Sequence, residues 1–334
     1  MGRVAPWAAI VKSALALWFA ALLISTALFP SVLSAQARRP VILASGSVDG
    51  AFYPIAGAIS RITSDARDLS FRVAVESSAG SIANVQLIRS GEADFALLQN
   101  DVAYYAFNGI TVDTFVGKPV KNLAGVFSVY PEIVHVIVRK AADVRSIRDL
   151  KGKRVVLGPP GSGAEQNALQ VLKVHGIREA DLRTVQSIGR TAAFDQLKAG
   201  LADAVFVSTA LGSPPIADAM ASGKLTLLGI GDSAGEALRR EYPFYTLERI
   251  PANSYPRQER EVTSAGVMAI LVARSSVSDE TVYALTKAVF DNLPQFQSSH
   301  PAARHLTLRT ALSGMALPLH PGAERFFQQS GLAR

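Results

Sequence analysis

One pattern occurs twice in this sequence. The segments LIRSGEADFALLQ (Leu87–Gln99) and QLKAGLADAVFVS (Gln196–Ser208) both run from a helix-like stretch through Gly-x-Ala-Asp into an apolar strand. Glycine suits the left-handed residue that ends a helix, and aspartate can cap the turn before a strand. Such joints are common in α/β proteins, but the repeated spacing favours two similarly built lobes. A cleft between two lobes is a usual place for a small-molecule site.

The rest of the chain alternates in the same way. Strand-like runs such as VILAS, FRVAVES and VHVIVR are separated by helix-like stretches such as YPIAGAISRIT and AAFDQLKAG. This alternation predicts an α/β protein with largely parallel sheets. Ligands of such sheets lie beyond the carboxyl ends of the strands, so Gln99 and Thr209 are candidates for one shared crevice. A polar strand end that caps the next helix is the alternative for each.

The first 37 residues have the pattern of a secretion signal. Arg3 and Lys12 precede an apolar block, ALALWFAALLISTALF, and AQA at residues 35–37 provides small residues for cleavage after Ala37. An uncleaved membrane anchor is the alternative, but Pro30 ends the apolar block early. We therefore expect a periplasmic protein.

Composition narrows the functional classes. Removal of Arg3 and Lys12 with the signal lowers the formal net charge from +7 to +5, and the basic residues are scattered. A nucleic-acid-binding protein needs a clustered basic stripe, so we expect no nucleic-acid partner. The chain has no cysteine, which excludes disulfides and cysteine metal sites.

Three loops between a strand and a helix carry small hydroxyls and glycines, at residues 45–50, 76–84 and 157–167. Backbone N–H groups at a helix start attract anions. No loop has the G-x-x-x-x-G-K-[ST] or G-x-G-x-x-G pattern of nucleotide sites. Asp49 and Glu165 would repel a highly charged phosphate unless they point away, and they can instead meet an ammonium group. We expect a neutral or carboxylate-bearing solute and no cofactor.

Long segments of the mature chain resemble the TAXI family, the extracytoplasmic solute receptors of TRAP-type transporters. They include GSVDGAFYPIAGAIS, VESSAGSIANVQLIRSGEADFALLQNDVAYYAFNG, SVYPEIVHVIVRK and LKGKRVVLGPPGSGAEQNA. The resemblance implies a two-lobe periplasmic-binding fold of class II type, in which two mixed or parallel sheets are joined by hinge strands. It also implies a monomer that passes a small organic solute, a carboxylate or an amino acid such as glutamate, to an ion-gradient-driven membrane permease. Such a receptor is no enzyme and binds no ATP.

The predicted organisation is a signal at residues 1–37, lobe 1 at 40–130, lobe 2 at 131–254, and a return to lobe 1 with C-terminal helices at 255–334. Hinge closure is expected to enclose the solute. The loops Ser45–Ser47, Ser77–Ser81 and Gly161–Gly163 would take its carboxylate. Asp49, Gln99, Asp101 or Glu165 would take an amino or hydroxyl group.

The predicted ligand-binding residues combine these loops with the positions that match the family. They are Ser45, Gly46, Ser47, Asp49, Phe52, Tyr53, Ser77, Ser78, Gly80, Ser81, Asn84, Gln99, Asp101, Tyr130, Gly161, Ser162, Gly163, Glu165, Asn167 and Thr209. Val48, Asp49 and Ala164 depart from the family pattern, which bears on the choice of solute. Arg190, outside this set, is a further candidate for a ligand carboxylate.

Other functions compete with this interpretation. GDSAG (Gly231–Gly235) fits the G-x-S-x-G of hydrolases, with Ser233 as nucleophile, but also reads as a loop and a capped helix. The five histidines include no H-E-x-x-H, so we expect no metal site. A binding protein of an ATP-driven importer, of the aliphatic sulfonate or thiamine-precursor sort, is the main alternative. A module that reports its ligand to a membrane kinase is another.

Overall fold

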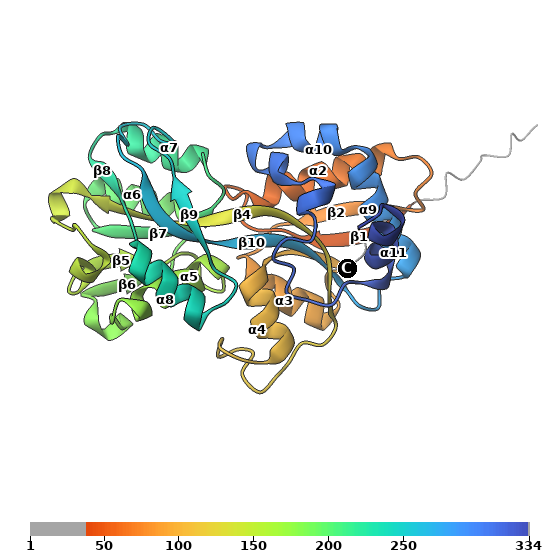
Figure 1. The fold of residues 1–334 in the computed structure, drawn as a ribbon, viewed down its shortest axis with the longest axis horizontal. Helices are drawn as coiled ribbons and strands as arrows, with labels where there is room; N and C mark the ends of the chain where they lie inside the picture. The colour runs from red at the N-terminus through yellow and green to blue at the C-terminus, as the bar shows by residue number, and fades with distance from the viewer. Residues whose placement is uncertain (1–37, 333–334) are drawn as a thin grey trace, which may run out of the picture. The chain divides into compact units, whose positions relative to one another are not determined.

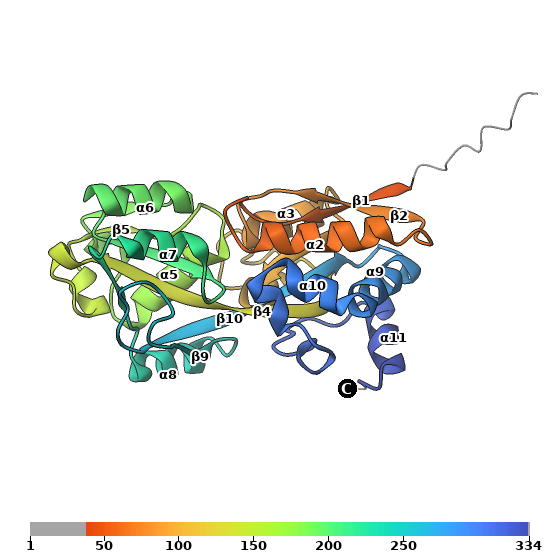
Figure 2. The ribbon, with the colours of Figure 1, turned by 90° about the horizontal axis from the view of Figure 1, so that it is seen from above.

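The computed structural model describes residues 38–332, so the predicted signal lies outside the described residues. Ten strands form one hydrogen-bonded sheet in the order β2-β1-β3-β10-β4-β7-β5-β6, with β8 paired to β4 and β9 paired to β10. Helices cover both faces of this sheet (Figure 1, Figure 2). Mixed strand directions and flanking helices agree with the expected α/β class.

The first half comprises residues 38–132 and 267–332. Its strands β1, β2 and β3 are parallel where they pair. Its elements are β1 (Arg39–Ala44), α2 (Phe52–Asp65), β2 (Phe71–Glu76), α3 (Ser81–Ser90), β3 (Phe95–Gln99), α4 (Asn100–Asn108), α9 (Asp279–Asp291), α10 (Leu293–Ser299) and α11 (Pro321–Gln329).

The second half comprises residues 133–266. Its strand β5 pairs in parallel with β6 and β7. Its elements are β5 (Arg154–Val156), α5 (Gly163–Val174), β6 (Thr184–Gln186), α6 (Arg190–Ala199), β7 (Ala204–Thr209), α7 (Pro214–Ala221), β8 (Leu225–Leu228), α8 (Asp232–Glu241) and β9 (Thr246–Ile250).

Two long antiparallel strands, β4 (Leu123–Arg139) and β10 (Val262–Arg274), run through both halves (Figure 1). The register of this pair shifts between Ala269 and Ile270 and again between Leu271 and Val272. These are the expected hinge strands, and they join the sheets of the two halves into one continuous ladder. Tyr255, the first residue of the predicted return to lobe 1, packs in the core of the second half, and its hydroxyl is 2.8 Å from Nε2 of the buried His135.

The apolar core is divided by the sheet. One cluster packs α2, α9, α10 and α11 on one face of the first half, and a second packs α6 and α7 on one face of the second half. A third cluster continues from α3 and α4 into α5 and α8, so it belongs to both halves. There the ring centroid of Tyr104 lies 4.5 Å from that of Phe244, which is a contact between the two halves.

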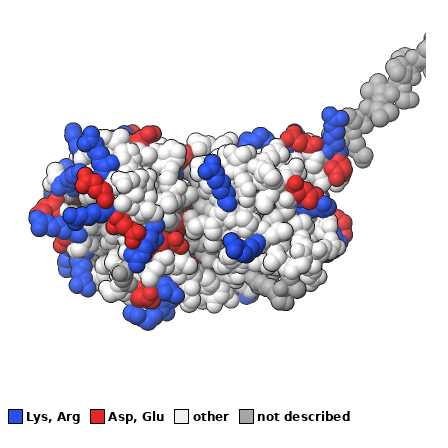
Figure 3. Space-filling model, turned by 45° about the horizontal axis from the view of Figure 1, so that its top comes forward, with Lys and Arg blue, Asp and Glu red and all other residues white. Residues whose placement is uncertain are grey.

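No helix within residues 38–332 has the length and apolar character needed to cross a membrane. Formal charge is unevenly divided between the halves. The second half has 18 Lys and Arg against 14 Asp and Glu, whereas the described first half has 13 of each kind. Figure 3 shows the basic side chains gathered on the half that contains β5–β9.

Candidate functional site

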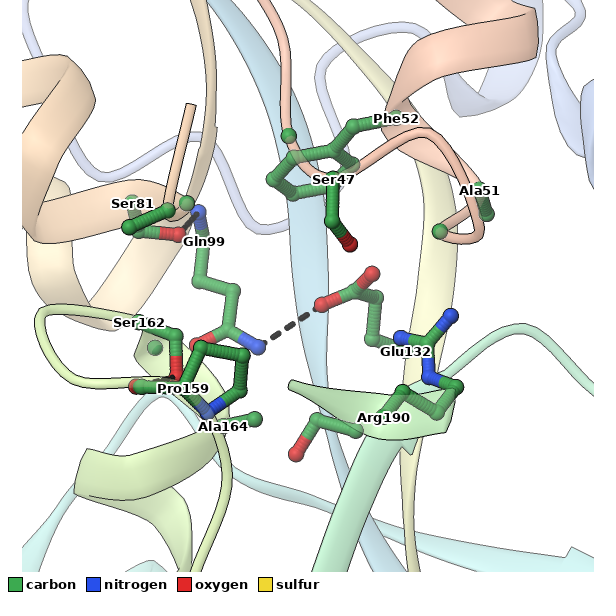
Figure 4. Close-up of a pocket in the computed structure, with 16 residues that line it drawn as sticks. Ser47, Ala51, Phe52, Ser81, Gln99, Glu132, Pro159, Ser162, Ala164 and Arg190 are labelled. Carbon is green, nitrogen blue, oxygen red and sulfur yellow. Dashed lines mark hydrogen bonds between the residues drawn. The ribbon is translucent and has the colours of Figure 1, made fainter. Parts of the chain in front are cut away.

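A cavity of about 60 Å³ lies between the halves, and we call it the first cavity. Its walls come from the loop after β1, the start of α3, the end of β3, the middle of β4, and the loops before α5 and α6. Figure 4 shows the labelled side chains around it. The lining residues are Gly46, Ser47, Gly50, Ala51, Phe52, Ala79, Gly80, Ser81, Gln99, Glu132, Pro159, Ser162, Gly163, Ala164, Arg190 and Ser208.

Two helices from opposite halves begin at this cavity. The N–H groups of Ser81, at the start of α3, and of Gly163 and Ala164, at the start of α5, have no hydrogen-bond partner within residues 38–332. The first N–H groups of a helix carry its positive dipole end and bind anions. The cavity therefore has main-chain donors on both sides.

A main-chain contact closes the halves beside the cavity. The N–H groups of Ile82 and Ala83 in α3 donate to the carbonyl of Gly161 from the other half, at 3.1 and 3.2 Å. Gly161 has a φ of 73°, a backbone conformation that favours glycine. These two amides are therefore engaged by protein and not by a solute.

Gln99, the last residue of β3, and Glu132, in the middle of β4, form a buried pair. Gln99 Nε2 donates to Glu132 Oε2 at 2.7 Å, and the Tyr130 hydroxyl donates to Glu132 Oε1 at 3.1 Å (Figure 4 shows the first bond). Burial raises the pKa of Glu132 to about 7. Gln99 Oε1 is buried and has no partner in the described part of the chain. A buried amide with an unpaired oxygen can accept a bond from a ligand.

Arg190, the first residue of α6, is the cation of the site. Its Nη1 donates to the carbonyl of Asp49 at 2.6 Å, across the cleft. Its Nε is buried and lacks a partner among the described residues. Thr191 Oγ1 also crosses the cleft and donates to Asp49 Oδ2 at 2.9 Å. A guanidinium with a spare donor beside two helix starts suits a carboxylate.

Eight of the predicted site residues line the first cavity. They are Gly46, Ser47, Phe52, Gly80, Ser81, Gln99, Ser162 and Gly163. Gly163 packs so closely on Gln99 that a Cβ at this position would overlap Gln99 Oε1. The contact between these two residues joins the halves.

Three predicted residues support the wall from behind. Asn84 Nδ2 donates to the carbonyls of Ser45 at 2.6 Å and Leu97 at 2.7 Å, and Ser78 Oγ donates to Asn84 Oδ1 at 2.6 Å. Ser45 is fully buried, and its hydroxyl donates to the carbonyl of Glu76 at 2.8 Å. These bonds fix the loops that follow β1 and β2.

Asp101 and Asn167 belong to a buried network between α4 and α5. Asn167 Nδ2 donates to Asp101 Oδ2 at 3.1 Å and to the Tyr245 hydroxyl at 2.7 Å, while Ser208 Oγ donates to Asn167 Oδ1 at 2.7 Å. Burial raises the pKa of Asp101 to about 7. Neither Asp101 nor Asn167 lines the first cavity.

The remaining predicted residues lie around these features. Tyr53 is 37% exposed and Ser77 is exposed, and neither lines the first cavity. Tyr130 is buried behind Glu132. Glu165 accepts from the Gly161 N–H at 3.0 Å and from Ser187 Oγ at 2.5 Å, within its own half. Asp49 and Thr209 line a neighbouring cavity.

Sequence reasoning missed two polar residues of the first cavity, Glu132 and Ser208. A carboxylate within the apolar run SVYPEIVHVIV was a usable signal, because a charged residue rarely lies inside a buried strand without a reason. Ser208 directly precedes Thr209, the predicted polar end of the same strand. Arg190, the further candidate for a ligand carboxylate, lines the cavity.

The structure also places the motifs of the alternative functions. G-x-S-x-G lies at the start of α8, Ser233 is exposed, and no hydrogen bond in the described region joins it to a histidine. Residues 38–332 contain no group of three or more His, Cys, Asp or Glu placed to hold a metal ion.

Comparison with known proteins agrees with this architecture. Residues 43–331 match the family described as the NMT1-like family. MatC from Rhodopseudomonas palustris, solved with bound malate, is 14% identical, with a TM-score of 0.57 over 87% of this chain and 98% of MatC. PhnD1 from Prochlorococcus marinus, solved with methylphosphonate, is 13% identical, with a TM-score of 0.55 over 89% of this chain and 100% of PhnD1.

The periplasmic binding protein BugD is 14% identical, with a TM-score of 0.54 over 87% of this chain and 95% of BugD. At such identities the likeness concerns the fold alone. The predicted α/β fold of the periplasmic-binding type is thereby confirmed.

Proposed function

This chain belongs to the NMT1-like family, and on that premise we propose that it is an extracytoplasmic receptor for a small organic carboxylate. The observation that carries the proposal is the convergence of donors on one cavity. The N–H groups of Ser81 and Gly163, from opposite halves, have no partner within residues 38–332, and they lie with Arg190 around the same small space. Helix starts and a guanidinium are the groups that hold a carboxylate.

Binding is coupled to movement of the halves about β4 and β10. The wall of the first cavity is complete only when the loops before α5 and α6 meet the starts of α2 and α3. A solute that contacts both halves favours the closed arrangement by its differential affinity. The membrane partner then recognises the surface of the closed form.

The membrane partner is a TRAP-type permease driven by an ion gradient, as the TAXI resemblance implies. Residues 1–37 direct export to the periplasm and are removed after Ala37. A gene for a large multi-span permease beside this one supports that partner. A neighbouring ATPase gene with G-x-x-x-x-G-K-[ST] supports the ATP-driven importer instead.

Replacement of Arg190 tests the proposal. We expect Arg190→Ala to weaken the binding of carboxylates roughly 10- to 100-fold, because charge-assisted bonds are lost from a partly buried site. Calorimetric titration of the mature protein with monocarboxylates, dicarboxylates and amino acids measures this change.

Arg183→Ala is the matched control, since Arg183 is exposed in the same half and lies outside the cavity. Equal affinities of the two variants for every acid that binds would contradict the role of Arg190. Failure of every acid to bind the unmodified protein would refute the receptor.

A further inference from the structure

A second cavity, of about 180 Å³, adjoins the first. The two share Gly50, Ala51 and Arg190 in their walls, so the guanidinium of Arg190 stands at their boundary. Asp49 and Thr209, which the sequence predicted as ligand-binding residues, line the second cavity and not the first.

The wall of the second cavity is mainly apolar and comes from both halves. Its apolar residues include Val48, Pro54, Leu211, Pro214, Pro215 and Pro301. Proline has a fixed φ and no N–H group, so four prolines give a rigid surface with few donors. Val48 is 68% exposed and Leu211 is 39% exposed, which places both among the few large apolar side chains exposed in residues 38–332. Grouped exposed apolar residues often mark a binding surface.

Three of the polar groups in its wall are already partnered by protein. Asp49 Oδ2 accepts from Thr191 Oγ1 at 2.9 Å, and the Gly212 N–H donates to the Tyr255 hydroxyl at 3.1 Å. His300 Nδ1 accepts from the Ala302 N–H at 3.1 Å. Arg190, which the two cavities share, is the one Lys or Arg among the described residues in its wall, so a second carboxylate has no cation of its own there, whereas an apolar group has extensive contact surface.

Building on the receptor function proposed above, we propose that the solute is a monocarboxylate with an apolar substituent, branched or aromatic, and that the second cavity holds this substituent. The carboxylate lies in the first cavity against Arg190 and the helix starts. Because Arg190 borders both cavities, the rest of the solute passes beside it toward Val48 and Leu211. The two halves then each contribute a wall to the substituent as well as donors to the carboxylate.

A series of acids tests this inference by NMR titration. Acetate, butyrate, isovalerate and phenylacetate share one carboxylate and differ in apolar size, and glutamate adds a second carboxylate with an amino group. We expect affinity to rise about three- to fourfold for each buried methylene, and glutamate to bind more weakly than phenylacetate. Leu211→Trp, which fills the cavity, is expected to lower the ratio of phenylacetate to acetate affinity at least tenfold.

Leu201→Trp is the control, because Leu201 is 60% exposed in the same half and lies away from both cavities. Val48→Trp fills the cavity from the first half and gives an independent second variant. Affinities that do not change along the series, or an unchanged ratio in both cavity variants, would overturn the inference and leave the receptor function standing. If no carboxylate binds at all, the receptor function itself fails, and the inference fails with it.

Discussion

At the scale of single residues, the fit between Gly163 and Gln99 decides whether the site can form. A Cβ on Gly163 would overlap the amide of Gln99, which is held in place by its bond to Glu132. A side chain at the first helical residue of α5 would therefore force the end of the Gln99 side chain to move from its place beside Glu132.

We expect Gly163→Ala to weaken solute binding by roughly tenfold or more, since forcing extra atoms into a packed contact costs about 1–3 kcal/mol. The separate halves keep their stability, because the overlap exists only where they touch. Calorimetric titration and thermal melting together check both statements.

Gly189→Ala is the matched control for that variant. Gly189 precedes α6, has a φ of −60°, and has no atom within 4 Å of an added Cβ. A loss of affinity in Gly189→Ala as large as that in Gly163→Ala would contradict the steric explanation.

Single residues also mark how far the sequence could be interpreted. Glycines and serines before helices identified the loops that line the first cavity, because such loops are recognised from a few neighbouring residues in the sequence. Glu132 and the partners of Asp101 depend on contacts between distant segments. A single sequence does not show which polar groups from distant segments come into contact. Asn84 and Asn167 were therefore predicted as ligand-binding residues, and in the structure their amides are hydrogen-bonded to other protein groups.

At the scale of elements, α4 and α5 are tied by a buried carboxylate. Asp101, in the first turn of α4, accepts from Asn167 of the second half, and Asn167 also donates to the Tyr245 hydroxyl. Burial raises the pKa of Asp101 to about 7, compared with an ordinary value near 4. Closing these helices together therefore favours the protonated acid.

The sign of the pH dependence follows from this shift. Below about pH 4 the Asp101 carboxyl is protonated whether it is buried or exposed, so no free energy is lost by burying a charge. As the pH rises from about 4 to about 7, the exposed state loses its proton first, so the stability of the folded, closed protein falls. Above about pH 7 this contribution is constant.

We expect Asp101→Asn to reduce the fall in melting temperature between pH 5 and pH 7.5, because the amide cannot ionise. Burial also raises the pKa of Glu132 to about 7, so part of the pH dependence of the melting temperature remains in this variant. Melting curves across this range measure the slope. Asp113→Asn, an exposed position in the same half, is the control, and equal slopes in all three proteins would refute the assignment to Asp101.

Elements were easier to predict than their pairing. The alternating pattern and the Gly-x-Ala-Asp joints predicted the strands β3 and β7 and the helices before them, because these signals are local. That β4 and β10 would be long enough to serve both halves was implied by family resemblance and not by periodicity. Strand pairing across more than a hundred residues is set by packing, which no local pattern contains.

At the scale of the whole molecule, the two halves are linked by two strands and meet at main-chain and side-chain contacts around the first cavity. Such an arrangement permits hinge motion, in which a solute shifts the balance toward closure.

Fluorescent labels measure this motion directly. The chain has no cysteine, so Arg67→Cys in the first half and Arg183→Cys in the second provide its two thiols, both at exposed positions. We expect energy transfer between the labels to change when a carboxylate binds. The same pair in Gly163→Ala should change less at an equal concentration of acid.

A pair of labels within the first half, at Arg67 and Asp113, serves as the reference and should not respond. An equal response of the two pairs would mean that the change lies within one half and not between them.

The two hydrogen bonds from α3 to Gly161 are made entirely by peptide groups. These two hydrogen bonds hold the halves together in the same way for every solute, because no side chain takes part in them. Substitutions of the side chains that line the cavity can therefore change which solute is bound and leave these two hydrogen bonds in place.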